Sequence, residues 1–152
     1  MQIKTVLLVE DNQDDELLTI RAFRKNRITN EVAVVRDGAE ALDYLHGTGD
    51  FSGKEPPPLP ECVLLDLNLP KVSGLQVLKK IREHSRTKLL PVIVLTSSKE
   101  ERDLVESYKL GANSYIRKPV DFEQFIEAVR QLGLYWLVLN ESPIKDDQAE
   151  QE

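Results

Sequence analysis

The sequence has little cysteine, little histidine and no long apolar segment. Its 152 residues include one cysteine and two histidines. A lone cysteine cannot form an internal disulfide, and Cys62 begins an apolar run, which favours a small buried side chain over a reactive thiol. No stretch approaches the roughly 18 apolar residues of a membrane span, and the first residues do not resemble a signal peptide. We therefore expect a cytoplasmic protein with no membrane segment.

The sequence also has fewer basic residues than acidic ones. The 26 acidic residues outnumber the 20 lysines and arginines, which gives a formal net charge of -6. Affinity for phosphate backbones needs clustered basic side chains, so this charge argues against a general nucleic-acid binder, and we expect no nucleic-acid partner. The composition, 41% hydrophobic and 30% charged, is typical of a folded globular chain. The length fits one ordinary domain.

Apolar runs alternate with helical patterns along the chain. Four runs are unbroken rather than alternating in hydrophobicity, which indicates strands covered on both faces. Between the runs, apolar residues recur at helical spacing, as in Leu75, Leu78 and Ile81. This alternation predicts an α/β fold with a parallel sheet and helices on both faces. The predicted strands are Val6–Val9, Val32–Val35, Val63–Leu67, Val92–Leu95 and, more weakly, Ser114–Arg117.

Local signals mark several boundaries of the predicted elements. Ser98–Glu101 fits a capping box at the start of the fourth helix. Gly47 and Gly111 fit helix ends. The segment 48–60 contains three consecutive prolines and is predicted to be a surface loop, because the strand and helix pattern resumes beyond it.

Polar side chains follow the predicted strands. Glu10 and Asp11 come after the first strand, Asp66 ends the third, Thr96 ends the fourth and Lys118 ends the fifth. Taken singly, Glu10 and Asp11 could open the first helix and Thr96 could be an ordinary strand residue. Ligands of an open parallel sheet bind outside the carboxyl ends of its strands. The joint placement therefore predicts one site that contains all five side chains.

The charge of this predicted site limits what it can hold. Three carboxylates about 5 Å apart would repel by roughly 3 kcal/mol per pair at an effective dielectric of about 20. A cation should bind, or one carboxylate should stay protonated, because Lys118 offsets only part of the charge. The hard oxygen donors favour Mg²⁺ or Mn²⁺ over zinc. With a lysine and a hydroxyl to receive phosphoryl oxygens, Asp66 is equipped to attack phosphorus and hold an acyl phosphate.

Four motifs resemble those of a known family. They are "LLVEDNQDD", "LLDLNLPKVSG", "VIVLTSS" and "GANSYIRKP". The match extends over residues 4–132 and is similar to the receiver domains of two-component response regulators, in the CheY-like superfamily. It implies a flavodoxin-like (βα)₅ fold, doubly wound, with strand order 2-1-3-4-5. It also implies a phosphoacceptor switch rather than an enzyme, although a receiver promotes its own phosphorylation and dephosphorylation.

The resemblance assigns the phosphoacceptor and the metal ligands. Asp66 would take a phosphoryl group from a phosphohistidine on a sensor histidine kinase. Asp11, Asp66 and the backbone carbonyl of Asn68 would ligate Mg²⁺ directly, with Glu10 assisting. Mn²⁺ could replace Mg²⁺ at the same ligands.

The resemblance also assigns the groups that respond to phosphorylation. Thr96 would hydrogen-bond the phosphoryl group, and Lys118 would pair with it. Thr96 would shift toward the phosphoryl group while Tyr115 turns inward. This change would remodel the surface of the fourth helix and the fifth strand, through which the protein would dock to its partners.

Two features exceed the common receiver pattern. The loop 48–60 is longer than usual, and "LGLYWLVLN" continues the last helix with apolar residues on all sides at 134–138. Such a helix is normally buried, so packing on its own domain and self-association both remain open. Both features are similar to single-domain regulators that partner phytochrome kinases, which implies a kinase of that type. We predict a homodimer through the fourth helix, fifth strand and last helix, with a receiver domain at 1–140 and an acidic, poorly ordered tail at 141–152.

Three other functions compete with this interpretation. A phosphatase of the haloacid-dehalogenase type needs a second aspartate two residues after the first, where this chain has Asn68. A flavodoxin needs a small, phosphate-binding loop after the first strand, where Glu10 and Asp11 would repel phosphate. A pseudo-receiver that only docks to partners, without phosphorylation, is the serious alternative, but every residue of the chemistry is present.

Overall fold

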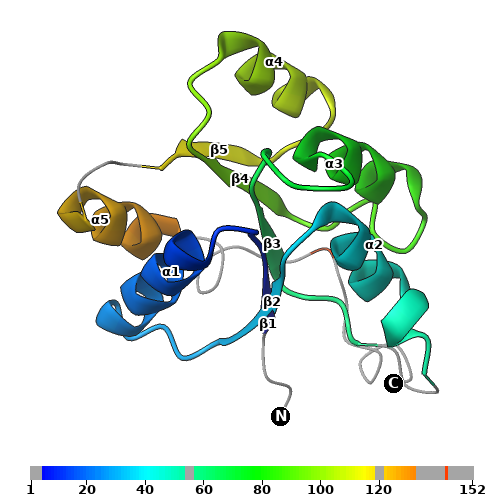
Figure 1. Ribbon diagram of the computed structural model, residues 1–152, viewed down its shortest axis with the longest axis horizontal. Helices are drawn as coiled ribbons and strands as arrows, with labels where there is room; N and C mark the ends of the chain where they lie inside the picture. Colours follow the sequence, from blue (N-terminus) through cyan, green and yellow to red (C-terminus); the bar gives the residue numbers. More distant parts are fainter. Residues whose placement is uncertain (1–4, 54–56, 119–121, 133–142, 144–152) are drawn as a thin grey trace.

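The structure is a computed structural model that describes residues 5–53, 57–118, 122–132 and 143 (Figure 1). Strands and helices alternate along these residues, as the hydrophobic pattern predicts. The strands are β1 Thr5–Val9, β2 Glu31–Val35, β3 Cys62–Leu65, β4 Val92–Thr96 and β5 Ser114–Arg117. The helices are α1 Gln13–Lys25, α2 Gly38–His46, the short 3₁₀ helix η1 Gly49–Phe51, α3 Gly74–Glu83, α4 Glu101–Lys109 and α5 Phe122–Leu132.

The strands form one parallel sheet in the order β2-β1-β3-β4-β5. The predicted fold class and strand order are therefore confirmed. All residues of β3 and β4 are buried, which explains why their sequences are apolar without alternation. Strand β3 ends at Leu65, one residue before Asp66, so this carboxylate lies just outside the sheet.

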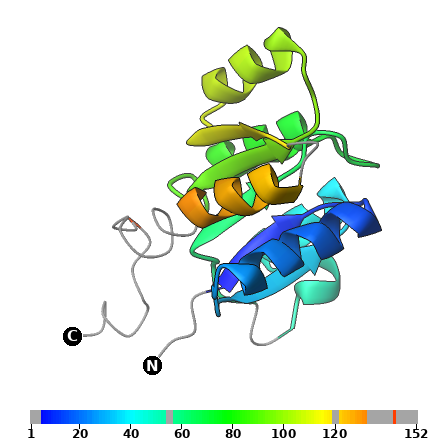
Figure 2. The same cartoon turned by 90° about the vertical axis from the view of Figure 1, so that its left-hand side faces the viewer.

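Helices cover both faces of the sheet, and a separate apolar cluster fills each interface. Helices α1 and α5 lie side by side on one face (Figure 2), where Phe23 and Val129 pack with Leu8 and Leu64 of the strands. Helices α2 and α3 cover the other face, where the core contains Leu45 and other buried side chains. Helix α4 packs beside α3 and β5. The carboxyl edge of the sheet is left free for a site.

Short-range signals explain most helix boundaries. Ser73 and Gln76 form a capping box at the start of α3, and Gly47 ends α2 in the left-handed conformation with φ of 66°. Gly111, with φ of 99°, follows α4 as predicted. The capping box predicted at Ser98–Glu101 is wrong. Helix α4 begins at Glu101 with Glu100 as its uncapped N-cap, so Ser98 lies two residues before the N-cap position, and its hydroxyl donates to Asp103 at 2.6 Å.

A glycine lets α3 begin directly beneath the end of β3. A Cβ atom at Gly74 would lie 2.3 Å from the carbonyl oxygen of Asp66 and 2.5 Å from Cα of Leu67. Any other residue would push the helix away from the segment that carries Asp66. The start of α3 thus fixes the backbone that positions this carboxylate.

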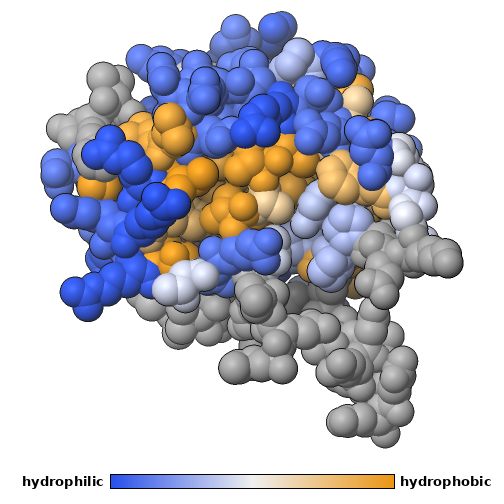
Figure 3. Space-filling model, turned by 60° about the horizontal axis from the view of Figure 1, so that its bottom comes forward, coloured by the Kyte–Doolittle hydropathy of each residue, from blue (hydrophilic) through white to orange (hydrophobic). Residues whose placement is uncertain are grey.

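Hollows lie at both the amino edge and the carboxyl edge of the sheet. At the amino edge, a hollow of about 450 Å³ between α1 and β2 is lined by apolar side chains and arginines, including Phe23, Ile28, Arg24 and Arg27. Figure 3 shows apolar surface between hydrophilic regions on the side that it turns forward. The hollow at the carboxyl edge is acidic and is described below.

Two predicted segments lie outside the described residues. They are the apolar extension of the last helix at 134–138 and, apart from Pro143, the acidic tail at 141–152. Within the described part of the chain, none of the helices has the length and apolar character needed to cross a membrane.

Candidate functional site

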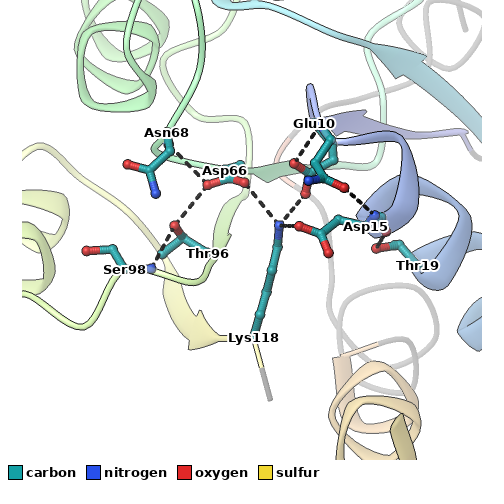
Figure 4. A network of polar contacts seen from close by, with 9 residues as sticks. Glu10, Asp15, Thr19, Asp66, Asn68, Thr96, Ser98 and Lys118 are labelled. Atoms are coloured by element: carbon teal, nitrogen blue, oxygen red, sulfur yellow. Dashed lines mark hydrogen bonds and ion pairs between the residues drawn. The ribbon is translucent and has the colours of Figure 1, made fainter. Parts of the chain in front are cut away.

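Four elements bring the predicted site residues together at the carboxyl edge of the sheet (Figure 4). Glu10 follows β1, Asp66 follows β3, Thr96 ends β4 and Lys118 follows β5. Parallel strands place all of these positions at the same edge, so residues up to 108 apart in sequence come into contact.

Lys118 lies at the centre of the site. Its ammonium group forms ion pairs with Glu10, with Asp15 at 3.0 Å and with Asp66 at 3.0 Å. The side chains of Lys118, Glu10 and Asp66 are only 9%, 2% and 6% exposed. A buried charge persists only when it is paired, so the lysine is what allows the Asp66 carboxylate to be buried here.

The two oxygens of Asp66 have separate partners. Oδ2 accepts from Lys118, whereas Oδ1 accepts from the Thr96 hydroxyl at 2.9 Å and from the Asn68 backbone N–H at 3.1 Å. Three donors therefore hold the carboxylate in one orientation. The Thr96 hydroxyl oxygen in turn accepts from the Ser98 backbone N–H at 3.3 Å.

The site shifts the pKa values of its carboxyl groups in opposite directions. Burial raises the pKa of Glu10 to about 8, although Lys118 opposes this shift. Burial also acts to raise the pKa of Asp66, but the Lys118 charge and the Asn68 N–H outweigh it, so the pKa lies below its usual value. For Lys118, the bond to Glu10 and the charges of Asp66 and Glu10 outweigh burial and raise the pKa. Asp66 is therefore an anion at neutral pH and Lys118 a cation.

The acidic residues form a cluster that could hold a metal ion. One carboxylate oxygen from each of Glu10, Asp11 and Asp66 lies within 4.8 Å of the others. Asp11 is exposed, and the cluster opens into a hollow of about 500 Å³ whose lining also includes Asn68 and Ser97. An all-oxygen, anionic donor set beside open space fits Mg²⁺ or Mn²⁺, which retain several water ligands.

Most predicted site residues are brought together, but one lies apart and one was missed. Tyr115 lies on β5 beside Val94, and burial raises the pKa of its phenol. In the described part of the structure, it does not bond to Asp66. Asp15 contacts Lys118, but its position after Asp14 in a run of acids gives only the signal of a first helical turn.

A comparison with protein families matches residues 6–130 to the response regulator receiver domain. The chain belongs to this family. Its five-stranded sheet has the same strand order as the receiver fold, and the acidic cluster is consistent with the phosphorylation site of such domains.

Relatives of this receiver domain extend over nearly the whole chain. The probable methanogenesis regulatory protein FilR2 of Methanothrix harundinacea is 44% identical over 91% of the chain and 86% of its own length. The response regulator Rcp1 of Synechocystis is 37% identical over 88% of the chain and 89% of its own length. The crystal structure of the phosphorylated cyanobacterial phytochrome response regulator RcpA has a TM-score of 0.85 at 37% identity, and covers 94% of this chain and all of its own.

The raised pKa of Glu10 predicts how stability depends on pH without metal. The folded protein keeps the Glu10 proton until about pH 8, whereas the unfolded chain releases it near the ordinary value of 4.5. Stability should therefore fall between about pH 5 and pH 8, by about 2 to 4 kcal/mol. The pKa of Asp66 is lowered, so the contribution of this carboxylate to the free energy of unfolding is lost only at more acidic pH.

Urea unfolding in a chelator at several pH values tests this dependence. Glu10→Gln should flatten the profile between pH 5 and pH 8, because the amide cannot titrate but can still accept from Lys118. Glu83→Gln, at the exposed end of α3, is the matched control and should keep the slope of the parent protein. Parallel profiles for the parent and Glu10→Gln would contradict the prediction.

Proposed function

We propose that the chain is a single-domain response regulator that accepts a phosphoryl group on Asp66 and signals by docking to partner proteins. The observation that carries this proposal is the Asp66 carboxylate itself. It is buried, anionic, held by Lys118 and Thr96, and adjacent to the acidic cluster and its hollow. Membership in the receiver family supports the same role.

The transfer would use the groups around Asp66 as follows. A carboxylate oxygen of Asp66 forms a bond to phosphorus while the bond from phosphorus to the donor histidine nitrogen breaks, and the histidine keeps the electron pair. Lys118 and Thr96, which bond to Asp66 beforehand, would then donate to the phosphoryl oxygens. The donor is the phosphohistidine of a sensor histidine kinase, as for receiver domains generally.

We propose that Glu10, Asp11, Asp66 and the Asn68 backbone carbonyl hold Mg²⁺, with Mn²⁺ as a substitute. When bound, the ion would neutralise charge on the phosphoryl oxygens during transfer. The oxygen donors of the acidic cluster support this assignment. A crystal structure of the related regulator Rcp1 is a Mn²⁺-bound form, with a TM-score of 0.85 to this chain at 35% identity, covering 93% of this chain and 99% of that one.

Thr96 and Tyr115 would form the switch that responds to phosphorylation. Hydrogen bonds already connect Asp66 through Thr96 to Ser98, whose hydroxyl donates to Asp103 in the first turn of α4. Movement of Thr96 toward a phosphoryl group would therefore disturb the start of α4. A charge added at Asp66 supplies the difference in free energy that a two-state switch needs.

We further propose that the kinase is of the phytochrome type and that the protein acts in the cytoplasm. The likeness to the phytochrome response regulator RcpA supports the first assignment. The surplus of acidic residues agrees with the expectation that nucleic acid is not a partner.

Phosphorylation by acetyl phosphate is the direct test of the proposed function. The parent protein should gain the mass of one phosphoryl group when Mg²⁺ is present and none in a chelator, as measured by intact-protein mass spectrometry. Asp66→Asn should gain none, whereas Asp50→Asn, an exposed control in η1, should match the parent. No gain by the parent, together with no Mg²⁺ binding, would favour a docking module that is not phosphorylated.

We also propose a homodimer through α4, β5 and the last helix. Val105 and Tyr108 lie three residues apart on α4 and are 49% and 51% exposed, so they form adjoining apolar surface on one helix face, which supports a contact there. Sedimentation velocity should show a dimer that Val105→Glu weakens at least about tenfold, since charge at an apolar contact is costly. Leu17→Glu, equally exposed on α1, should not weaken it. A parent monomer at high concentration, with and without a phosphoryl mimic, would contradict the dimer.

A further inference from the structure

Asp15 is a carboxylate in contact with Lys118 that the roles proposed above do not use. It lies in the first turn of α1 and points at the ammonium group from the side opposite Thr96 and Asn68 (Figure 4). Its Oδ2 is 3.0 Å from Lys118 Nζ, the same distance as Oδ2 of Asp66. Its side chain is 36% exposed, so it is the most accessible of the three carboxylates on this lysine.

The contacts of Lys118 leave it without a spare hydrogen-bond donor. An ammonium group has three N–H donors and no acceptor. Glu10, Asp15 and Asp66 each accept from Nζ, so every donor already has a carboxylate partner. A phosphoryl oxygen can bond to Lys118 only if one of these three carboxylates gives up its hydrogen bond or shares it.

Charge makes Asp15 a competitor of the phosphoryl group. Oδ2 of Asp15 and Oδ2 of Asp66 each lie 3.0 Å from Nζ, so they are at most about 6 Å apart. Phosphorylation of Asp66 adds one negative charge on that side of the lysine, while Asp15 keeps its own charge on the other side. At this separation, two anions that share one cation weaken each other's hold on it.

We infer that Asp15 is a positioning residue that shares Lys118 with the phosphoryl group and so limits the stability of the phosphorylated state. This inference rests on the function proposed for Asp66. The carboxylate acts through Lys118 and does not itself touch the reacting atoms. Its removal should favour any ligand that adds negative charge at Asp66 and should disfavour a bare cation in the acidic cluster.

Beryllium trifluoride is a suitable probe, because it bonds to an aspartate in place of a phosphoryl group and adds one negative charge. At saturating Mg²⁺, Asp15→Asn should bind it about 5-fold more tightly than the parent, a size suited to a partly exposed charge pair. Without beryllium trifluoride, the same variant should bind Mg²⁺ about 2-fold more weakly than the parent does, because the site loses a negative charge. Isothermal titration calorimetry measures both affinities on the full chain.

The opposite signs of these two shifts separate positioning from structural damage. Loss of structure would lower the affinity for beryllium trifluoride and the affinity for Mg²⁺ together. Asp14→Asn is the matched control, since it removes the same charge from the same exposed helical turn, and in the described structure Asp14 forms no ion pair with Lys118. Asp14→Asn should leave the affinity for beryllium trifluoride within about 2-fold of the parent, well short of the roughly 5-fold gain of Asp15→Asn, and Asp15→Glu should restore the parent values.

Two results would overturn the inference, and a third would overturn its basis. If Asp15→Asn binds beryllium trifluoride no more tightly than the parent does, Asp15 does not limit the stability of the phosphorylated state. An equal effect of Asp14→Asn would show a general charge effect rather than an action through Lys118. If the parent protein itself fails to bind beryllium trifluoride with Mg²⁺, the function proposed for Asp66 fails, whatever the role of Asp15.

Discussion

The buried ammonium group of Lys118 is the interaction on which the site depends. It joins Glu10 after β1, Asp66 after β3 and Asp15 in α1, and it is nearly inaccessible to solvent. Without this cation, the buried Asp66 carboxylate would have no positive partner, which is costly at low effective dielectric. With it, Asp66 keeps a pKa below its usual value and remains a nucleophile, while Glu10 is left with a raised pKa. The positive charge of Lys118 thus both stabilises the site and keeps Asp66 ionised for reaction.

The fold supplies the geometry that this charge balance requires. Parallel strands bring Thr96 and Lys118 to the same edge as Asp66, and Gly74 allows α3 to start directly beneath the segment that carries it. The hydrogen bonds from Asp66 through Thr96 and Ser98 end on α4, so a change of charge at the site has a short path to an exposed helix. A receiver domain needs this combination of a fixed acceptor and a responsive surface.

Sequence patterns predicted the sheet and most of the site, because both depend on signals that are local in the chain. Unbroken apolar runs indicated covered strands, and a polar residue at each strand end had to meet the others once the strands were parallel. The start of α4 was predicted wrongly because the helix begins at Glu101, three residues after Ser98, whose hydroxyl donates to Asp103. Asp15 was missed because its partner lies 103 residues away and an acid in a first helical turn is ordinary. Competition between long-range and local partners is what sequence spacing does not show.

The most direct test of the central claim is to find which residue carries the phosphoryl group. Borohydride reduces an acyl phosphate to an alcohol, so treatment of the phosphorylated protein marks the acceptor carboxyl group permanently. Peptide mapping by mass spectrometry should then show reduction at Asp66, and at this position alone among the carboxylates of the site. Reduction at Glu10 or Asp11, with Asp66 unmodified, would contradict the view that Lys118 and Thr96 hold Asp66 as the acceptor.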